Sequence, residues 1–308
     1  MEPCQKLDPL GLVAALSILS IATGCASPGD GVTVLKQPTT LPIVISQPGS
    51  YRLGSNIVVP DANTTAIRVE SRDVTIDLNG FAILGPTICT GIPVSCTQTG
   101  SGSGVVAVGN AGKRENVVVH GGTIKGMGSD GVNLSEQATV SHVRAISNGN
   151  NGIIGNQGSR ITENVAIANG NRGIATAERS IVTGNVANEN GNGINMNSQG
   201  VVSGNTVNFN KEDGISCANN CTVTGNTAHG NGFGTPSSAP TARGIVTNTG
   251  STLIGNTVSD NKGFGLLMVT NVGFVNNVLN GNNGGNANPQ LSGGIKLGSN
   301  LCGGVVCP

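Results

Sequence analysis

The sequence predicts an all-β chain folded as a parallel β-helix, a solenoid of about ten coils with three short strands in each coil. A repeat of about 21 residues fills the stretch 131–282. Apolar residues stand in short clusters separated by Gly and Asn, without a helical period, which favours strands joined by tight turns. Each row opens on glycine followed by an aliphatic residue, at Gly131, Gly152, Gly173, Gly193, Gly214, Gly244 and Gly265.

Columns of equivalent residues support one coil per row. Coils stack about 4.8 Å apart, so equivalent residues lie over one another. The apolar column is predicted to form the core, and the two asparagine columns are predicted to be hydrogen-bonded turn ladders, not a binding site. The apolar column is Val140, Ile161, Val182, Val202, Val223, Leu253 and Phe274. One asparagine column is Asn148, Asn169, Asn190, Asn210, Asn231, Asn261 and Asn282. The other is Asn164, Asn185, Asn205, Asn226, Asn256 and Asn277, with Val143 in its first row.

Residues 1–26 are predicted to be an export signal. The apolar run from Leu12 to Ala22 is too short to span a bilayer and is followed by small residues. The letters ATGC at 22–25 resemble a bacterial lipobox in which Cys25 would be lipidated, although alanine replaces the usual leucine. A lipid anchor at Cys25 and free release after Ala26 both stay open. No other run is long enough for a membrane span.

The remaining chain reads as one solenoid with closed ends. Residues 27–65 are predicted to be N-terminal cap strands, 66–293 the β-helix repeats, and 294–308 a closing segment, because an open solenoid end exposes unpaired backbone. Insertions in repeat arrays often line a binding face, so the excursions from the coils are candidate walls of a site. These excursions are 85–103, 232–243 and 282–293.

The cysteines indicate an oxidising compartment. Of the eight cysteines, Cys4 and Cys25 lie near the N-terminus, and the others form three close pairs. Pairs this local are typical of disulfides in secreted or cell-envelope proteins. Zinc is the rival interpretation for the middle pair, but no second Cys or His pair stands nearby. The three pairs are Cys89 with Cys96, Cys217 with Cys221, and Cys302 with Cys307.

The chain is sparsely charged and neutral overall. Charged residues make up 10% of the chain and the formal net charge is zero. Nothing in this composition attracts nucleic acid or an anionic membrane surface, so a lipid anchor would be the one route to a membrane. The chain has no Trp, one Tyr and five Phe, so a carbohydrate would be held mainly by Asn, Ser, Thr and Arg.

The rows, such as GIIGNQGSRITENVAIANGNR at 152–172, resemble the β-helix repeat of the pectin-lyase-like superfamily. The run at 45–83 resembles the N-terminal segment of bacterial secreted β-helix repeat proteins. The resemblance covers nearly all of the chain after the signal and implies a right-handed, single-stranded parallel β-helix. It is much less specific for chemistry, since the superfamily holds lyases, hydrolases, epimerases and proteins without known activity.

In this superfamily the working face is usually the first strand and its flanking turns, so the residue before each opening glycine is informative. This column of alternating charge is predicted to be either a solvated edge with weak salt bridges or a groove that binds a polar polymer along the axis. We call it the polar column, and it comprises Asp130, Asn151, Arg172, Asn192, Asp213 and Arg243.

A polygalacturonase-like hydrolase is disfavoured. The string Ser129 to Val132 resembles one piece of that family's motif, but the next coil carries no acid at Asn151 and no Gly-His-Gly occurs. The next acid in the column, Asp213, lies four coils on, about 19 Å away. Paired glycosidase carboxylates lie about 5–9.5 Å apart.

A polysaccharide lyase needs less, and it is the alternative function. In β-elimination one base removes the proton beside a uronate carboxylate, and a cation, often calcium, neutralises that carboxylate. No cluster of acids for calcium is visible, so no cofactor is predicted unless the chain is a lyase. The residues for such a lyase would be His120, Lys125, Asp130, His142 and Arg144. The favoured function is a non-catalytic surface scaffold or polysaccharide-binding protein.

Overall fold

The computed structural model describes residues 31–107, 114–233 and 242–307. The predicted export signal and the lipidation site at Cys25 lie outside these residues. Val32–Pro308 forms one compact unit. Its regular secondary structure consists of strands, most of them three residues long, as the sequence predicts. Within the described ranges, no helix is long and apolar enough to cross a membrane.

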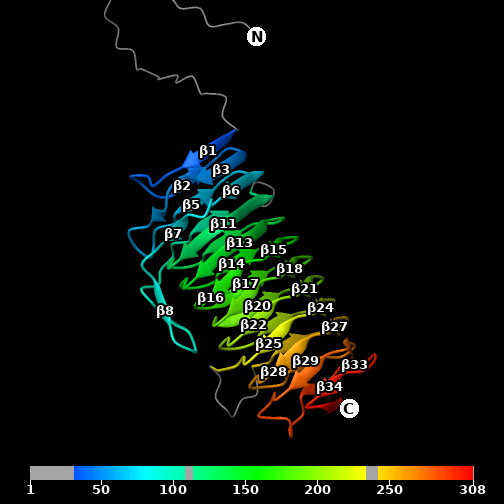
Figure 1. The fold of residues 1–308 in the computed structure, drawn as a ribbon. Coiled ribbons are helices and arrows are strands. Elements are labelled where there is room, and N and C mark those ends of the chain that lie inside the picture. The colour runs from blue at the N-terminus through cyan, green and yellow to red at the C-terminus, as the bar shows by residue number, and fades with distance from the viewer. Residues whose placement is uncertain (1–30, 108–113, 234–241, 308) are drawn as a thin grey trace, which may run out of the picture. The chain divides into compact units, whose positions relative to one another are not determined.

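The strands form three stacks that run along the solenoid (Figure 1). The first stack is an 11-stranded parallel sheet, which agrees with the prediction of about ten coils. Its strands are β2 (Ile43–Ile45), β5 (Ile67–Val69), β10 (Val105–Ala107), β12 (Val132–Leu134), β14 (Ile153–Gly155), β17 (Arg172–Thr176), β20 (Asn192–Met196), β23 (Ile215–Cys217), β26 (Ile245–Thr247), β29 (Leu266–Met268) and β32 (Leu291–Ser292).

The second and third stacks share two long strands, β11 (Val117–Lys125) and β13 (Thr139–Ile146), which join them into one 22-stranded sheet. The second stack also holds β1 (Val32–Leu35), β3 (Gly49–Leu53), β6 (Val74–Asp77), β15 (Arg160–Thr162), β18 (Ile181–Thr183), β21 (Val201–Ser203), β24 (Thr222–Thr224), β27 (Thr252–Ile254), β30 (Gly273–Val275) and β33 (Ile295–Lys296). The third stack holds β4 (Ile57–Val58), β7 (Ala82–Leu84), β16 (Val165–Ile167), β19 (Val186–Asn188), β22 (Thr206–Asn208), β25 (Thr227–His229), β28 (Thr257–Ser259), β31 (Val278–Asn280) and β34 (Leu301–Cys302).

The two ends of the solenoid differ. At the N-terminal end, β2, β3 and β4 pair in parallel with β5, β6 and β7, so residues 43–58 form a coil of the same solenoid. At the C-terminal end, β35 (Val305–Val306) turns back antiparallel on β34. The segment 294–308 thus continues both stacks of the large sheet by one strand before the chain reverses.

The core is built from one inward residue in most strands of the second and third stacks and from one or two in strands of the first stack. Ile174, Val182 and Ala187 supply the three strands of one coil, and all are fully buried. The predicted apolar column from Val140 to Phe274 is buried throughout, with at most 2% exposure at Phe274. No single coil encloses enough apolar area to be stable alone, so the core exists only through stacking.

Each regular coil between residues 131 and 282 turns at three corners, and a residue with left-handed φ stands at each of them. In the coil that begins at Gly152 these residues are Gly158, Glu163 and Ala168, with φ of 70°, 57° and 55°. Neighbouring coils place Gly, Asn or a larger side chain at the same corner positions. A single left-handed residue turns the chain without a hairpin, which keeps every strand parallel to its neighbour.

The two asparagine columns form buried ladders, as predicted. Asn190 Oδ1 accepts from both the backbone N and Nδ2 of Asn169 at 2.9 Å, while Asn169 Nδ2 also donates to the Ala145 carbonyl at 3.0 Å. The second ladder begins where Val143 breaks its column, because the Val143 N–H donates to Asn164 Oδ1. Both ladders satisfy backbone groups that the tight corners leave without a partner.

The ladders extend further than the repeat indicates. Gln290 Oε1 accepts from the backbone N of Asn282 at 2.9 Å, and Asn300 Oδ1 accepts from that of Asn277 at 2.9 Å. These two residues lie outside the regular spacing, in an excursion and in the closing segment. The final rungs therefore have partners although the repeat has ended.

All three predicted disulfides are present. The sulfur atoms of Cys89 and Cys96 lie 2.04 Å apart, those of Cys217 and Cys221 2.01 Å, and those of Cys302 and Cys307 2.15 Å. The zinc interpretation of the middle pair is therefore wrong.

Candidate functional site

The three excursions leave the solenoid at one corner, which we call the third corner. It follows the third strand stack and leads into the first stack of the next coil, as residues 147–152 do between β13 and β14. The excursion 85–103 lies between β7 and β10, 232–243 lies between β25 and β26, and 282–293 follows β31 and contains β32. The described residues at the start and end of each excursion therefore lie along a single edge of the solenoid.

A disulfide-linked hairpin of β8 (Ile88–Thr90) and β9 (Ser95–Thr97) packs on this edge (Figure 1). A Cβ atom at Gly170 would lie 3.0 Å from Cys96 Sγ, and one at Gly149 would lie 2.9 Å from Thr99 Cγ2. The glycines therefore let the hairpin lie against the next coils, where it covers the N-terminal part of the third corner.

The polar column runs along the third corner as a further ladder. Asp130 is 5% exposed, and its Oδ1 accepts from the backbone N and Nδ2 of Asn151 at 3.1 and 2.9 Å. Its Oδ2 accepts from Asn133 Nδ2 at 2.8 Å. Asn151 Oδ1 in turn accepts from the backbone N of Arg172 at 3.2 Å. The column is thus internally hydrogen-bonded at its N-terminal end.

An ion pair holds the other end of the polar column. Asp213 Oδ1 accepts from the backbone N and the Nε of Arg243 at 2.8 Å each, and Arg243 NH2 lies 2.6 Å from Asp213 Oδ2. The side-chain hydrogen bond to Asp213 raises the pKa of Arg243. Glu212 turns toward the preceding coil instead, where Asn192 Nδ2 donates to its Oε2 at 2.9 Å.

Arg172, in the middle of the column, differs from its neighbours. Its Nε is buried and, within the described part of the chain, has no hydrogen-bond partner. A buried donor of a charged group that lacks an acceptor is destabilising and rare in folded proteins. It is the one fully buried side-chain nitrogen or oxygen of the polar column that has no hydrogen-bond partner in the described structure.

The five residues of the lyase hypothesis do not form one cluster. Lys125 and Arg144 are exposed on the outer face of the third stack, in neighbouring coils. His120 and His142 stand at the corner before that stack, where each has its own carboxylate. His120 Nδ1 lies 3.7 Å from Asp77 Oδ1, and His142 Nε2 lies 2.6 Å from Glu163 Oε2.

Asp130 lies at the next corner, with both of its carboxylate oxygens held by amides. This arrangement leaves no acid free beside the two histidines to share a calcium ion. Across the described residues, no group of three or more His, Cys, Asp or Glu could hold a metal ion.

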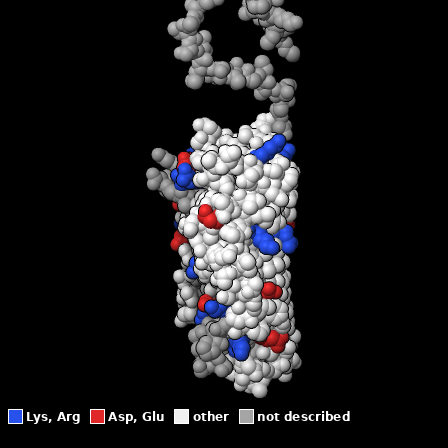
Figure 2. Space-filling view, turned by 90° about the vertical axis from the view of Figure 1, so that its left-hand side faces the viewer, with Lys and Arg blue, Asp and Glu red and all other residues white. Residues whose placement is uncertain are grey.

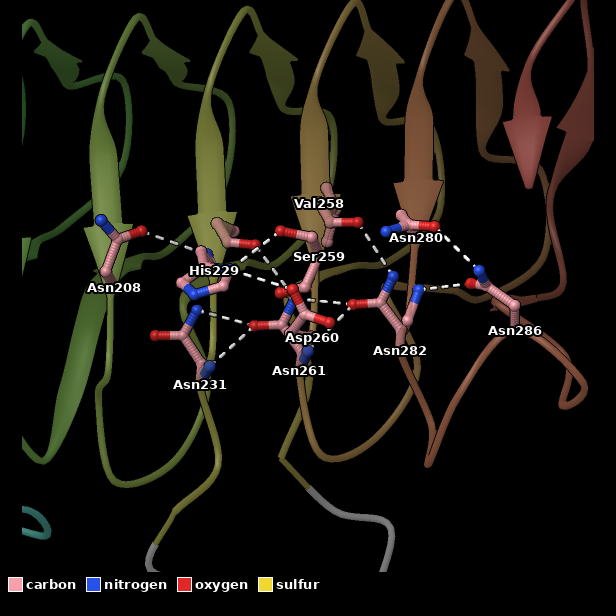
Figure 3. A network of polar contacts seen from close by, with 12 residues as sticks. Asn208, His229, Asn231, Val258, Ser259, Asp260, Asn261, Asn280, Asn282 and Asn286 are labelled. Carbon is pink, nitrogen blue, oxygen red and sulfur yellow. Dashed lines mark hydrogen bonds and ion pairs between the residues drawn. The ribbon is translucent and has the colours of Figure 1, made fainter. Parts of the chain in front are cut away.

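An aromatic and polar cluster on the same edge escaped the sequence analysis. The aromatic cluster, as we call it, comprises Phe209, His229, Phe233, Ser259 and Asp260. Phe209 and Asp260 occupy left-handed corner positions, and His229 and Ser259 end β25 and β28 in register (Figure 3). The sequence signal for this cluster is Phe209, because phenylalanine stands there at a left-handed position of the third corner where other coils place a smaller or an acidic residue.

The surface around this edge is weakly charged. Figure 2 shows lysine, arginine and acidic side chains scattered singly over a face that is mostly uncharged. Recognition on this face therefore depends on individual hydrogen bonds and ring contacts, not on a field of one sign.

No protein-family model matches the sequence, and no curated protein matches it. Solved structures do match. The A-module of Azotobacter vinelandii mannuronan C-5 epimerase AlgE4 has a TM-score of 0.56 at 17% identity, over 90% of this chain and 82% of that chain. A mutant of the periplasmic alginate epimerase AlgG has a TM-score of 0.59 at 14% identity, over 89% of this chain and 78% of that chain. These similarities confirm the right-handed parallel β-helix fold.

Proposed function

We propose that the protein binds an extended acidic polysaccharide along the third corner, outside the cytoplasm, and leaves the polymer unchanged. The observation that carries this proposal is Arg172, a partly exposed arginine in the middle of the polar column whose buried Nε has no hydrogen-bond partner among the described residues. A uronate carboxylate would bind the guanidinium group from the solvent side through its terminal nitrogens, since guanidinium groups bind carboxylates through paired hydrogen bonds.

The geometry of the edge supports a polymer as the ligand. The polar column repeats once per coil, about 4.8 Å apart, parallel to the solenoid axis. Its partly exposed members are Arg172, Asn192 and Arg243, and these are the side chains that a polymer would contact. The excursions at the same corner border it at both ends. The similar structures are by name epimerases of mannuronan or alginate, and they support a polyuronate as the first ligand to test.

Three disulfides support a location in an oxidising compartment, which means secretion or the cell envelope. The export signal and either a lipid anchor at Cys25 or free release belong to this proposal. The lyase alternative keeps Lys125, His142 and Arg144 as its candidate residues.

Binding to a polysaccharide panel tests the proposal. Oxidised protein of residues 27–308 is titrated calorimetrically with alginate, pectate and glycosaminoglycan oligomers, with and without calcium. The wild type is expected to bind at least one of them, and Arg172→Gln is expected to weaken that binding about tenfold, the loss of a desolvated charged contact. Arg160→Gln is the matched control, because Arg160 is exposed on the second stack.

Ultraviolet absorbance of the same mixtures separates binding from elimination. A rise from unsaturated uronate that Lys125→Ala or His142→Ala abolishes would establish the lyase instead. Equal binding by the wild type and Arg172→Gln would remove Arg172 from the site and overturn the proposed contact.

A further inference from the structure

We propose that the aromatic cluster is a second carbohydrate subsite, one that takes an uncharged, hydroxylated sugar ring. It does not depend on acidic polymer binding at the polar column. It lies where the third strand stack meets the third corner, across three successive coils. Figure 3 shows its polar members His229, Ser259 and Asp260.

The stacking of coils positions the polar members of the cluster. His229 is aligned with Ser259 of the next coil, and its Nδ1 lies 2.9 Å from Ser259 Oγ and 3.3 Å from Asp260 Oδ2. The buried rungs Asn231 and Asn261 lie directly beneath and hold both turns (Figure 3). The imidazole is thus oriented by its neighbours, while the His229 and Asp260 side chains remain 37% and 55% exposed.

The rings form a connected aromatic surface. Phe209 meets His229 edge to face, with centroids 5.1 Å apart and planes at 88°, and Phe233 lies 5.8 Å from Phe209. Gly230 permits this contact, because a Cβ atom there would lie 2.8 Å from the Phe209 ring. Phe233 is 45% exposed, so a ring face is open to a ligand.

The arrangement is suited to binding and not to nucleophilic catalysis. A catalytic relay needs the serine and the acid on opposite nitrogens of the imidazole. Here both Ser259 and Asp260 contact Nδ1, so the histidine cannot pass a proton from one to the other. In the described structure, Nε2 of His229 makes no hydrogen bond and points to no other acid.

The chemistry of the cluster selects the ligand class. An aromatic face packs against the apolar C–H face of a pyranose, and a carboxylate with an imidazole binds its hydroxyl groups. Among its five residues the cluster holds one acid, Asp260, and no lysine or arginine. It therefore offers no cation of that kind to attract a uronate, and an uncharged hexose ring fits it best.

Titration with neutral oligosaccharides tests this subsite. Gluco-, manno- and galacto-oligosaccharides are added to the oxidised protein, and binding is followed by calorimetry and saturation-transfer NMR. The wild type is expected to bind at least one series. Phe233→Ala is expected to raise its Kd about tenfold or more, as loss of an exposed aromatic anchor does. Asp260→Asn, which keeps a residue suited to left-handed φ, is expected to raise it about threefold.

Two controls keep the outcome interpretable. Val269→Ala also truncates an exposed apolar side chain, since Val269 is 46% exposed, but this residue lies at another corner. The variant should leave the Kd for the neutral oligosaccharides unchanged. Arg172→Gln should likewise leave it unchanged, so failure at the polar column and failure here are separate results. Absence of binding to every neutral series, or unchanged binding by Phe233→Ala with a wild-type circular dichroism spectrum, overturns the proposal.

Discussion

Asn169 donates two hydrogen bonds to a single oxygen of Asn190, one from its backbone N–H and one from its side-chain amide, each at 2.9 Å. The same bond pair recurs from coil to coil, so the side chain of one coil satisfies the backbone of the coil before it. Stability in this protein is therefore shared between an apolar core and two continuous polar ladders.

Removing one rung should be strongly destabilising. Asn190→Ala removes the acceptor of the Asn169 backbone N–H and of one Nδ2 hydrogen in a fully buried place, while the other Nδ2 hydrogen keeps the Ala145 carbonyl. We expect the free energy of unfolding in urea to fall by about 2–6 kcal/mol, at 1–3 kcal/mol for each of the two lost hydrogen bonds. Asn219→Ala is the control, because that side chain is exposed, and it should change the value by less than about 0.5 kcal/mol. A similar loss for both variants would contradict a special role for the ladder.

The corner positions give a prediction with the opposite sign. Ala168 has φ of 55°, and other coils place Gly126, Gly230 or Gly281 at this position. Ala168→Gly removes left-handed strain of about 1–2 kcal/mol. Glycine also gives the unfolded chain more conformational freedom, which offsets part of this gain. We expect the free energy of unfolding in urea to rise by about 0.5–1 kcal/mol. Ala166→Gly makes the same change in a buried strand position and should destabilise the protein. Destabilisation by both variants would show that the corner is not strained.

The pair of Asp213 and Arg243 should contribute more than an exposed pair. Their side chains are 11% and 25% exposed, and the contact is bidentate. A double-mutant cycle with alanine at both positions is expected to give a coupling energy of about 1–3 kcal/mol. The cycle for Arg68 and Glu70, which are 47% and 36% exposed, should give less than about 1 kcal/mol. Equal coupling in the two cycles would contradict this ranking.

Asp73 provides a prediction about acid pH. Its pKa lies below the ordinary 3.8, mainly because Asn116 donates a hydrogen bond to its carboxylate. A carboxyl whose folded pKa is lowered stabilises the fold above its unfolded pKa and loses that contribution as the pH falls through the folded value. Asn116→Gly keeps a residue suited to the left-handed φ of 55° at this position but removes the donor.

In Asn116→Gly, carbon-detected NMR titration should show the pKa of Asp73 moving up toward 3.8. The difference in Tm between this variant and the wild type should be present at neutral pH and shrink below pH 3.8. An unchanged Asp73 titration would show that Asn116 is not the cause.

The sequence predicts the coils because their residues repeat at a fixed spacing, and stacking converts spacing into contact. The ladder at Asn148 to Asn282 and the buried Phe274 follow from that rule alone. Gln290 and Asn300 could not be predicted, since they lie in segments where the period is broken. The aromatic cluster was missed for a related reason: Phe209 and Phe233 meet only through a corner and an excursion. Whether the polar column binds a ligand depends on single atoms, such as Arg172 Nε, that no pattern reports.

The identical rungs also make the length of the solenoid adjustable. Every interior coil presents the same donors and the same acceptor. A rung could therefore pair with the rung two coils away in the same way that it pairs with its immediate neighbour. A coil such as 173–192 could be excised, which would bring Asn169 against Asn210 and leave the closing residues Gln290 and Asn300 in place. Such a deletion or duplication changes the number of polar-column residues along the third corner and leaves both ends of the solenoid intact, so the length of this surface can change by whole coils.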